Sequence, residues 1–191
     1  MSRQHADQTS LAVLLEGQSR TRAVGAVLGR LVDLPAIGPV LARLARAPMS
    51  LRRLSAGTTR FHAWLLRRSG GRLRRSWLFA AGQPVLSLTT TGQRSGLART
   101  TAVACFAHGD DLAVAGMNLG RPHDPGWAHN LRACPEATID LGGRTLQVRA
   151  RETAGAEAEE LWQRWVRLQP SAPAFRRLAG RAVPIFVLTR R

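Results

Sequence analysis

Residues 84–117 read PVLSLTTTGQRSGLARTTAVACFAHGDDLAVAGM, and this stretch decides the fold because its hydrophobic period is two. Alternating apolar and polar side chains, rich in Val, Leu and Thr, predict strands at 85–91, 99–107 and 112–117. A His-Gly-Asp-Asp turn at 108–111 joins the second strand to the third. Strands with such short connections predict an antiparallel sheet.

The pattern continues toward the C-terminus. Gly142-Gly143 is a hairpin signal between two further strands, and a β-branched strand ends the chain. These strands are predicted at 137–141, 144–151 and 183–189, with helices at 126–133, 157–168 and 174–178. About six short, mostly antiparallel strands with flanking helices predict an α+β or mainly β fold, a small curled barrel. A Rossmann fold is disfavoured, because no Gly-x-Gly-x-x-Gly follows the first strand.

The front of the chain is different in period and charge. Residues 1–79 carry 14 arginines against three acidic residues, whereas residues 80–191 carry 14 arginines against nine. We expect a basic helical extension at 1–50 and a domain at 51–191, with a helix at 50–68 and the barrel at 84–190. Two interpretations of the extension stay open: it lies on an anionic membrane surface, or it packs on the barrel as a helical collar.

Composition excludes several classes of protein. The 191 residues carry a formal charge of +16, and every basic residue is arginine, with no Lys and no Tyr, so neither a lysine Schiff base nor a phenolic acid is available. Two cysteines, Cys105 and Cys134, make neither a disulfide framework nor a four-cysteine zinc site. We expect inert thiols in a reducing, cytoplasmic compartment, without a signal peptide or a membrane-spanning helix.

The first segment that could carry chemistry is Thr89–Thr101. Its two glycines permit a tight turn that brings backbone N–H groups toward a ligand. Arg94 and Arg99 offer guanidinium groups that match a phosphate or carboxylate. The hydroxyl groups of the segment add further donors, so it predicts an anion site between two strands. The alternative is a solvated hairpin with incidental arginines.

The second segment is Ala115–Leu131. Asp124 stands where a helix N-cap belongs, and Pro125 suits the first helical position. Trp127 and Asn130 are three residues apart and share one helix face. An indole and an amide beside a strand end would suit a planar heterocycle. The alternative is that Trp127 belongs to the core and Asn130 caps.

Two other clusters are less informative. The spacing of His123, Asp124 and His129 matches no helical metal-binding pair, so we expect no metal site. The two tryptophans of the late helix, Trp162 and Trp165, are expected in the core rather than at a ligand.

Both segments together resemble the deazaflavin-dependent nitroreductase family of actinobacteria, whose members are split β-barrel oxidoreductases related to the flavin-binding pyridoxamine-phosphate-oxidase-like group. The resemblance runs from about residue 60 to the C-terminus. The family's first motif is matched by Thr90, Thr91, Gly92, Arg94, Ser95, Gly96 and Arg99. Its second motif is matched by Asn118, Gly120, Pro125, Trp127, Asn130, Leu131, Ala133 and Pro135.

The resemblance implies reduced coenzyme F420 as the cofactor and an F420H2-dependent oxidoreductase that passes a hydride to a small, lipophilic acceptor: a quinone, a nitro compound or an activated alkene. It implies cofactor contacts at Gln93, Arg94, Ser95, Arg99, Thr100, Thr101, Ala115, Gly116, Met117, Asn118, Gly126, Trp127 and Asn130. It places Gln169, Ala172 and Phe175 on the substrate side, where family members carry tyrosines. Without Tyr, proton delivery would fall to water or another group.

The sequence departs from the family at Gln93, where a second basic residue is common, and at Met117, where a small hydroxyl residue is common. A related barrel that binds FMN, haem or a lipid is the alternative function. A nucleic-acid binder ranks last, because the strands lack interleaved aromatic residues. The resemblance is compatible with a homodimer, and a quinone acceptor would suit a protein held peripherally on the inner face of the membrane.

Overall fold

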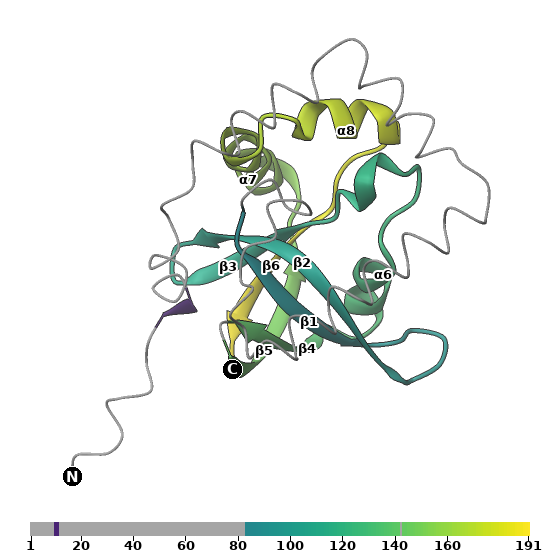
Figure 1. Cartoon of the computed structure of the whole chain (residues 1–191), viewed down its shortest axis with the longest axis vertical. Helices are drawn as coiled ribbons and strands as arrows, with labels where there is room; N and C mark the ends of the chain where they lie inside the picture. The colour runs from purple at the N-terminus through teal and green to yellow at the C-terminus, as the bar shows by residue number, and fades with distance from the viewer. Residues whose placement is uncertain (1–9, 12–82, 142) are drawn as a thin grey trace.

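The protein is described by a computed structural model that covers residues 10–11, 83–141 and 143–191. Six strands form a closed antiparallel barrel (Figure 1). They are β1 (Val85–Thr91), β2 (Ala98–His108), β3 (Asp111–Ala115), β4 (Glu136–Leu141), β5 (Arg144–Glu152) and β6 (Ile185–Arg190). Their order around the barrel is β1-β2-β3-β6-β5-β4, and β4 pairs again with β1. The predicted antiparallel barrel is confirmed.

Hairpins account for most of the topology. Strands β1 and β2 pair from Thr91 opposite Ala98, and β4 and β5 pair up to Leu141 opposite Arg144. The last strand, β6, lies between β3 and β5 and closes the barrel. Strand β3 ends two residues before the predicted Met117, at a backbone hydrogen bond from Gly116 N to Pro184 O.

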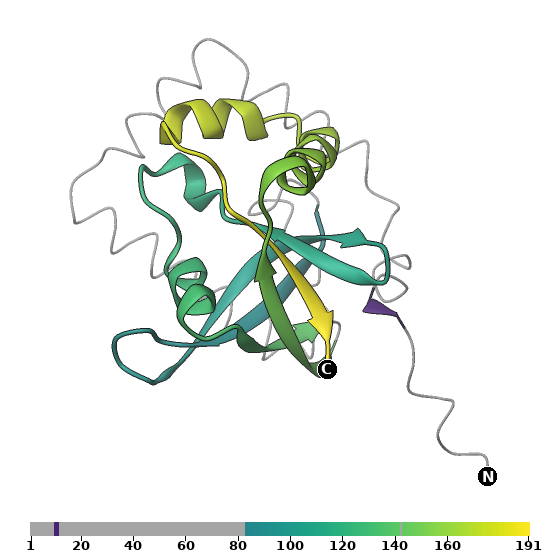
Figure 2. The ribbon, with the colours of Figure 1, turned by 180° about the vertical axis from the view of Figure 1, so that it is seen from behind.

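The helices are η1 (Asn118–Gly120, a 3₁₀ turn), α6 (Gly126–Ala133), α7 (Gly155–Leu168) and α8 (Ala172–Ala179). Figures 1 and 2 show α7 and α8 together at one end of the barrel, while α6 lies beside β1. Helix α8 is longer than the predicted 174–178, because Pro173 is favourable in its first turn. It ends at Gly180, which adopts the left-handed conformation of a C-terminal cap (φ 62°).

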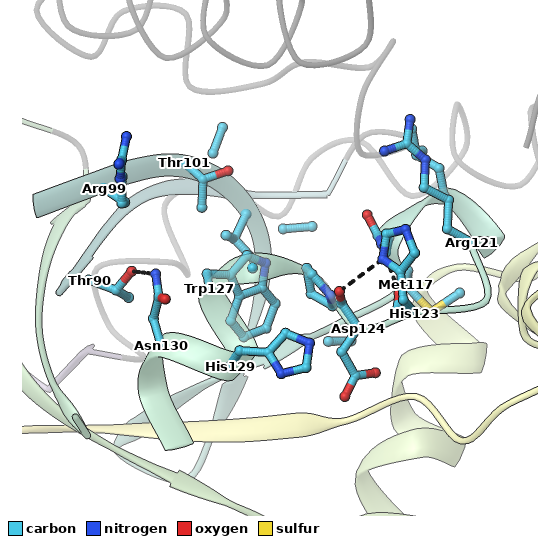
Figure 3. Close-up of a pocket in the computed structure, with 18 of the residues that line it drawn as sticks. Thr90, Arg99, Thr101, Met117, Arg121, His123, Asp124, Trp127, His129 and Asn130 are labelled. Carbon is cyan, nitrogen blue, oxygen red and sulfur yellow. Dashed lines mark hydrogen bonds between the residues drawn. The ribbon is translucent and has the colours of Figure 1, made fainter. Parts of the chain in front are cut away.

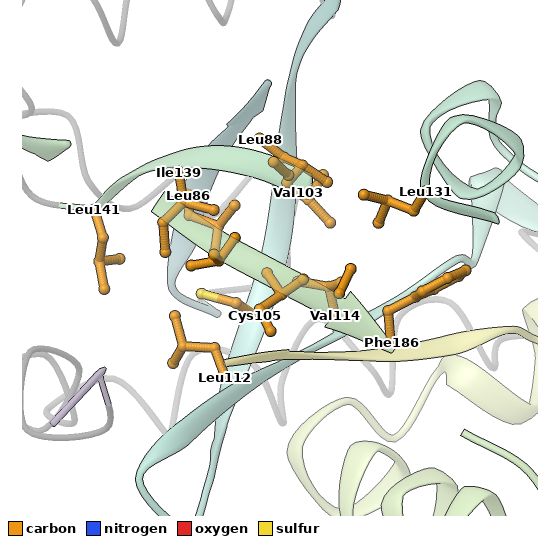
Figure 4. Packing of buried hydrophobic residues seen from close by; sticks show 14 of the residues in the cluster. Leu86, Leu88, Val103, Cys105, Leu112, Val114, Leu131, Ile139, Leu141 and Phe186 are labelled. Carbon is orange, nitrogen blue, oxygen red and sulfur yellow. The ribbon is translucent and has the colours of Figure 1, made fainter. Parts of the chain in front are cut away.

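The barrel interior is apolar. Leu86, Leu88, Cys105 and Val114 are fully buried there, together with Phe186 (Figure 4). Burial raises the pKa of the Cys105 thiol to about 12, so this cysteine stays protonated and unreactive at neutral pH. A second cluster between the barrel and α7 is centred on Trp165, whose ring lies 5.3 Å from that of Phe106.

The predicted extension at 1–50 lies outside the described residues apart from Ser10 and Leu11, and the predicted helix at 50–68 lies wholly outside them. Within the described part of the chain, no helix combines the length and the apolar character that crossing a membrane requires.

The fold predicts that Leu88 and Leu97 differ greatly in their contribution to the free energy of unfolding. Leu88 is fully buried in the barrel, whereas Leu97 on the β1–β2 turn is 62% exposed. We expect Leu88→Ala to lower the free energy of unfolding by about 2–5 kcal/mol, because it leaves a cavity. Leu97→Ala, the matched control, should change it by less than about 0.5 kcal/mol. Urea unfolding followed by circular dichroism measures both, and equal losses would contradict the interior packing.

Candidate functional site

A cavity of about 910 Å³ opens on the side of the barrel where the two sequence segments meet (Figure 3). Its walls come from β2, the β1–β2 turn, the loop after β3, helix α6, and the α7–α8 region. The volume is within the usual range of cofactor and substrate pockets. The structure therefore brings together residues that lie up to about 85 positions apart in the sequence, from Thr90 to Phe175.

The β1–β2 turn is compact because of its glycines. A Cβ atom at Gly92 would lie 2.8 Å from the Ser95 hydroxyl oxygen and 3.1 Å from the Leu97 carbonyl oxygen, so a larger residue does not fit. The carbonyl of Gly92 accepts hydrogen bonds from the N–H groups of Ser95 (3.1 Å) and Gly96 (2.8 Å). The N–H groups of Gly92 and Leu97 also donate within the turn.

This arrangement corrects one expectation. Backbone N–H groups at the turn were expected to face a ligand, but those of Gly92, Gln93, Ser95, Gly96 and Leu97 already donate to oxygen atoms of the protein. What the turn leaves available is the pair of guanidinium groups of Arg94 and Arg99, which line the cavity. Arg99 makes one long contact, 3.5 Å from Nη2 to the Ser95 hydroxyl, and neither arginine forms an ion pair within the described residues. One end of the cavity therefore carries positive charge suited to an anion.

Asn130 connects helix α6 to this turn. Its Oδ1 accepts a hydrogen bond from the backbone N–H of Gln93 (3.0 Å), and its Nδ2 donates to the buried hydroxyl of Thr90 (2.9 Å). Both ends of the amide are thus occupied by the protein, as Figure 3 shows for Thr90. Asn130 lines the cavity, and its amide fixes the position of the arginine-bearing turn.

Trp127 belongs to both the core and the cavity. Its ring packs against the barrel cluster and meets Phe186 edge to face at 5.6 Å. The half-buried indole also lines the cavity. The sequence offered two interpretations of Trp127, a core residue or a ligand-facing residue, and its ring contributes to both the core and the cavity wall.

Asp124 does not act as the predicted N-cap. Helix α6 begins after Pro125, and no side chain caps it. The Asp124 carboxylate instead forms ion pairs with Arg132 (2.7 Å) and with Arg181 (2.8 Å). A tertiary ion pair with two guanidinium groups has displaced the local hydrogen bond that the sequence position favours.

Arg181 holds the loop between β3 and α6 closed. Its guanidinium donates to the carbonyl oxygens of Gly116 (3.0 Å) and Arg121 (3.2 Å), at the two ends of η1, while it pairs with Asp124. Burial lowers the pKa of Arg181. The pKa of Arg132 is raised, chiefly by its hydrogen bond to Glu152 and to a smaller extent by that to Asp124. Both groups stay cationic at neutral pH, because arginine titrates far above it.

The loop also holds unusual backbone. Asn118 and Leu119 adopt positive φ angles of 46° and 53°, which are costly for residues other than glycine. The Asn118 side chain donates to the carbonyl oxygen of His123 (2.8 Å) and lies 3.1 Å from Nδ1 of the same histidine. His123 Nδ1 is also 3.2 Å from the carbonyl oxygen of Asp124. These contacts fix the His123 ring on the cavity wall (Figure 3).

Most of the residues singled out in the sequence meet in this cavity. Those that line it are Arg94, Arg99, Thr101, Ala115, Met117, Asn118, Gly126, Trp127, Asn130, Gln169 and Phe175. Five others are outside the lining: Gln93, Ser95, Thr100, Gly116 and Ala172. Thr100 faces Thr89 across the hairpin, with 2.8 Å between their hydroxyl oxygens, and Ala172 is fully buried. Gly116 is packed so closely on Pro184 that a Cβ would lie 2.8 Å from its ring.

Further lining residues were not predicted: Thr90, Ala102, Val103, Ala104, Leu119, Arg121, His123, Asp124, Pro125, His129 and Trp165. Seven of them belong to the two sequence segments, and inclusion of every polar residue there would have found five: Thr90, Arg121, His123, Asp124 and His129. Trp165 was expected only in the core. It lies on α7, four residues before Gln169, and it also borders the cavity. Within the described residues, no group of three or more His, Cys, Asp or Glu side chains could hold a metal ion.

Comparison with known proteins agrees with this geometry. The family model described as F420H(2)-dependent quinone reductase matches residues 58–190. The chain belongs to this family. It is 30% identical over 137 residues to the F420H(2)-dependent quinone reductase Rv1261c of Mycobacterium tuberculosis, covering 69% of this chain and 89% of the relative. A putative F420H(2)-dependent quinone reductase of Mycobacterium bovis matches equally well.

Solved structures place the barrel in the same group. An F420-H2-dependent reductase, FDR-A, superposes with a TM-score of 0.50 at 28% identity, over 55% of this chain and 93% of that one. A structure described as a domain-swapped dimer gives a TM-score of 0.51 at 25% identity, over 65% of this chain and 96% of the other. The resemblance to split-barrel oxidoreductases is confirmed.

Removal of the Arg181 side chain should loosen the cavity wall. We expect Arg181→Ala to lower the free energy of unfolding by about 1.5–3 kcal/mol, because it leaves the carboxylate of Asp124, only 18% exposed, with one partner fewer. The control is Arg177→Ala, an exposed arginine of α8, which should cost less than about 0.5 kcal/mol. Chemical denaturation measures both, and an Arg181→Ala protein as stable as the control would refute the role given to this ion pair.

Proposed function

We propose that the protein is an F420H2-dependent oxidoreductase that passes a hydride from reduced coenzyme F420 to a small lipophilic acceptor, with a quinone as the favoured class. When bound, the deazaflavin ring supplies the hydride, and the protein binds and orients both reactants. One observation carries the proposal: Arg94 and Arg99 lie at one end of a cavity that continues past the indole of Trp127.

The charges of the cavity suit this cofactor. Coenzyme F420 carries a phosphate and a polyglutamate tail, and the arginine-bearing turn offers two guanidinium groups without an acidic partner in the described part of the chain. The only acidic residue among the described lining is Asp124, and two arginines neutralise it. We propose that Arg94 and Arg99 hold the phosphate.

The shape of the lining suits the flat ring system. The lining includes three small side chains, Ala102, Ala104 and Ala115, together with the indole of Trp127. Small residues and an indole in one cavity suit a planar heterocycle. The N–H groups of Gly116 and Met117 already donate to backbone carbonyls, so in this proposal the ring is bound chiefly by packing.

The acceptor would bind near α7 and α8, where Gln169 and Phe175 line the cavity. The indole N–H of Trp165 borders the same region, is buried, and has no hydrogen-bond partner in the described part of the chain. An unpaired donor of this kind suits a carbonyl oxygen, such as that of a quinone. The combination supports a flat, apolar acceptor with a carbonyl group.

We also make proposals about where the protein is located and how it assembles. The mycobacterial relatives favour an actinobacterial source, and the cysteine content favours the cytoplasm. The solved relative described as a domain-swapped dimer makes a homodimer reasonable here, and it stays a prediction. We further propose that the basic residues 1–50, which lie almost wholly outside the described range, hold the enzyme on an anionic membrane surface where lipophilic acceptors collect.

Cofactor binding tests the proposed function. Fluorescence or absorbance titration with coenzyme F420 should show saturable binding, and Arg94→Ala and Arg99→Ala should each weaken it. A lost charge-assisted contact of about 1.5–3 kcal/mol corresponds to roughly a 10- to 150-fold rise in Kd. The control is Arg144→Ala, an exposed arginine at the start of β5 and outside the cavity lining, which should bind as the wild type does.

Unchanged affinity in both turn variants would remove the phosphate assignment. Saturable binding of FMN or haem, with no binding of F420, would favour the alternative of a related barrel with different chemistry. Oxidation of F420H2 by a quinone such as menadione then tests the reaction itself.

The membrane proposal predicts an effect of lipid charge. The full chain should sediment with vesicles that contain 30% anionic phospholipid and should stay in solution with zwitterionic vesicles, because arginines gain energy only near a negative surface. Raising the salt concentration from about 0.1 M to about 1 M should release it, since screening shortens the range of the attraction from about 10 Å to about 3 Å. Equal binding to both vesicle types would contradict the proposal.

A further inference from the structure

A quinone that receives a hydride must also receive a proton, and the chain contains no tyrosine or lysine that could provide it. The titratable groups among the described lining residues are three arginines, Asp124, His123 and His129. Arginine does not release its proton near neutral pH. The Asp124 carboxylate is already paired with the guanidinium groups of Arg132 and Arg181. The two histidines remain, and histidine changes its charge between pH 5 and 8.

The two histidines differ in how they are held. Both residues are exposed, and His129 on α6 has no hydrogen-bond partner in the described part of the chain. His123 has both a donor and an acceptor beside one ring nitrogen: Asn118 Nδ2 lies 3.1 Å from Nδ1, and the Asp124 carbonyl oxygen lies 3.2 Å from it. Only His123 is therefore fixed in position at the cavity wall.

These two neighbours fit both protonation states of His123. In the neutral imidazole, Nδ1 accepts a hydrogen bond from the Asn118 amide, which leaves the hydrogen on Nε2. In the protonated imidazolium, Nδ1 carries a hydrogen and donates to the Asp124 carbonyl. The Asn118 amide then keeps its 2.8 Å bond to the His123 carbonyl, so it stays anchored in both states.

We propose that His123 is the proton donor for the acceptor during hydride transfer, and that Asn118 and the Asp124 carbonyl hold it ready in both protonation states. This inference rests on the proposed function. It also gives a reason for the positive φ of Asn118 (46°), since strained backbone persists where it places a functional group.

The step balances as follows. The hydride brings two electrons and one hydrogen to the quinone, and the resulting hydroquinone monoanion takes one proton from the His123 imidazolium. Oxidation of the hydride donor releases one further proton to solvent, and uptake of one proton from solvent restores His123. No additional oxidant or reductant is required.

Several charged groups lie around His123. Arg121 lies on the same loop, and Arg181 reaches that loop from the segment before β6. Asp124 is the acidic residue there, and its carboxylate is paired with Arg132 and Arg181. On α8, which packs against η1, Arg176 stacks over Trp162 at 4.8 Å, and Arg177 is exposed.

Steady-state kinetics at pH 5–9 with F420H2 and menadione test the proposal. Wild-type kcat/KM should fall as the pH rises through the ionisation of the donor, because the imidazolium is the active form. His123→Gln should flatten this decline and lower the rate at acid pH by about 100-fold, the usual scale of general acid catalysis. The control is His108→Gln, a histidine at the end of β2 outside the cavity, which should keep the wild-type profile.

His129→Gln is the competing variant. Loss of the pH-dependent decline in His129→Gln, with the decline intact in His123→Gln, would overturn the proposal and assign the proton to His129. A wild-type protein that binds F420H2 but shows no turnover would refute the proposed function. Turnover with an unaltered pH profile in His123→Gln would refute only the present inference.

A second measurement needs neither cofactor nor turnover. Imidazole ¹⁵N chemical shifts in the cofactor-free protein should show neutral His123 with its hydrogen on Nε2. Asn118→Ala removes the donor at Nδ1 and leaves the carbonyl oxygen of Asp124 beside it, so the hydrogen should move to Nδ1. A wild-type His123 that already carries its neutral hydrogen on Nδ1 would overturn the arrangement, whatever the kinetics show.

Discussion

One amide side chain joins the two halves of the site. Asn130 on α6 accepts from the backbone of Gln93 and donates to Thr90, so the helix that carries Trp127 and the turn that carries the arginines move together. A charged group that must meet a phosphate, and a ring that must meet a heterocycle, need a fixed separation. The barrel provides rigid strands on either side, but this side chain sets the register between helix and turn.

The opposite wall is fixed by charge. The carboxylate of Asp124 lies between Arg132 and Arg181, and Arg181 also binds carbonyl groups at both ends of η1. In this cluster the two arginines neutralise Asp124, the acidic residue of the described lining. Arg132 and Arg181 therefore have a structural role. The arginines of the turn have no acidic partner within the described residues, so their positive charge is available to an anionic ligand.

Local sequence signals predicted the strands well and the site only in outline. Alternation of apolar residues located all six strands, and the α6 boundaries at Gly126 and Ala133 were correct, because both depend on neighbours in the chain. Asp124 was misassigned as a cap, because its partners Arg132 and Arg181 come from tertiary structure. The hydrogen bonds made by the backbone N–H groups of the turn could not be predicted either. A glycine pattern indicates a tight turn, but it does not show which N–H groups bond within that turn.

Because the chain contains no tyrosine, the proposed proton donor lies on the loop after β3. A phenol on α7 or α8 would meet the acceptor from the substrate side, whereas His123 lies on the loop that also carries Asn118 and Met117. In these proposals proton delivery and ring contacts depend on the same few residues, and the hydrogen bonds of Arg181 hold the loop that carries them. That coupling explains why a strained segment with two positive φ angles is secured by an ion pair whose side chains are only 15% and 18% exposed. Surface loops are ordinarily mobile, and here the largely buried ion pair between Arg181 and Asp124 makes the loop rigid.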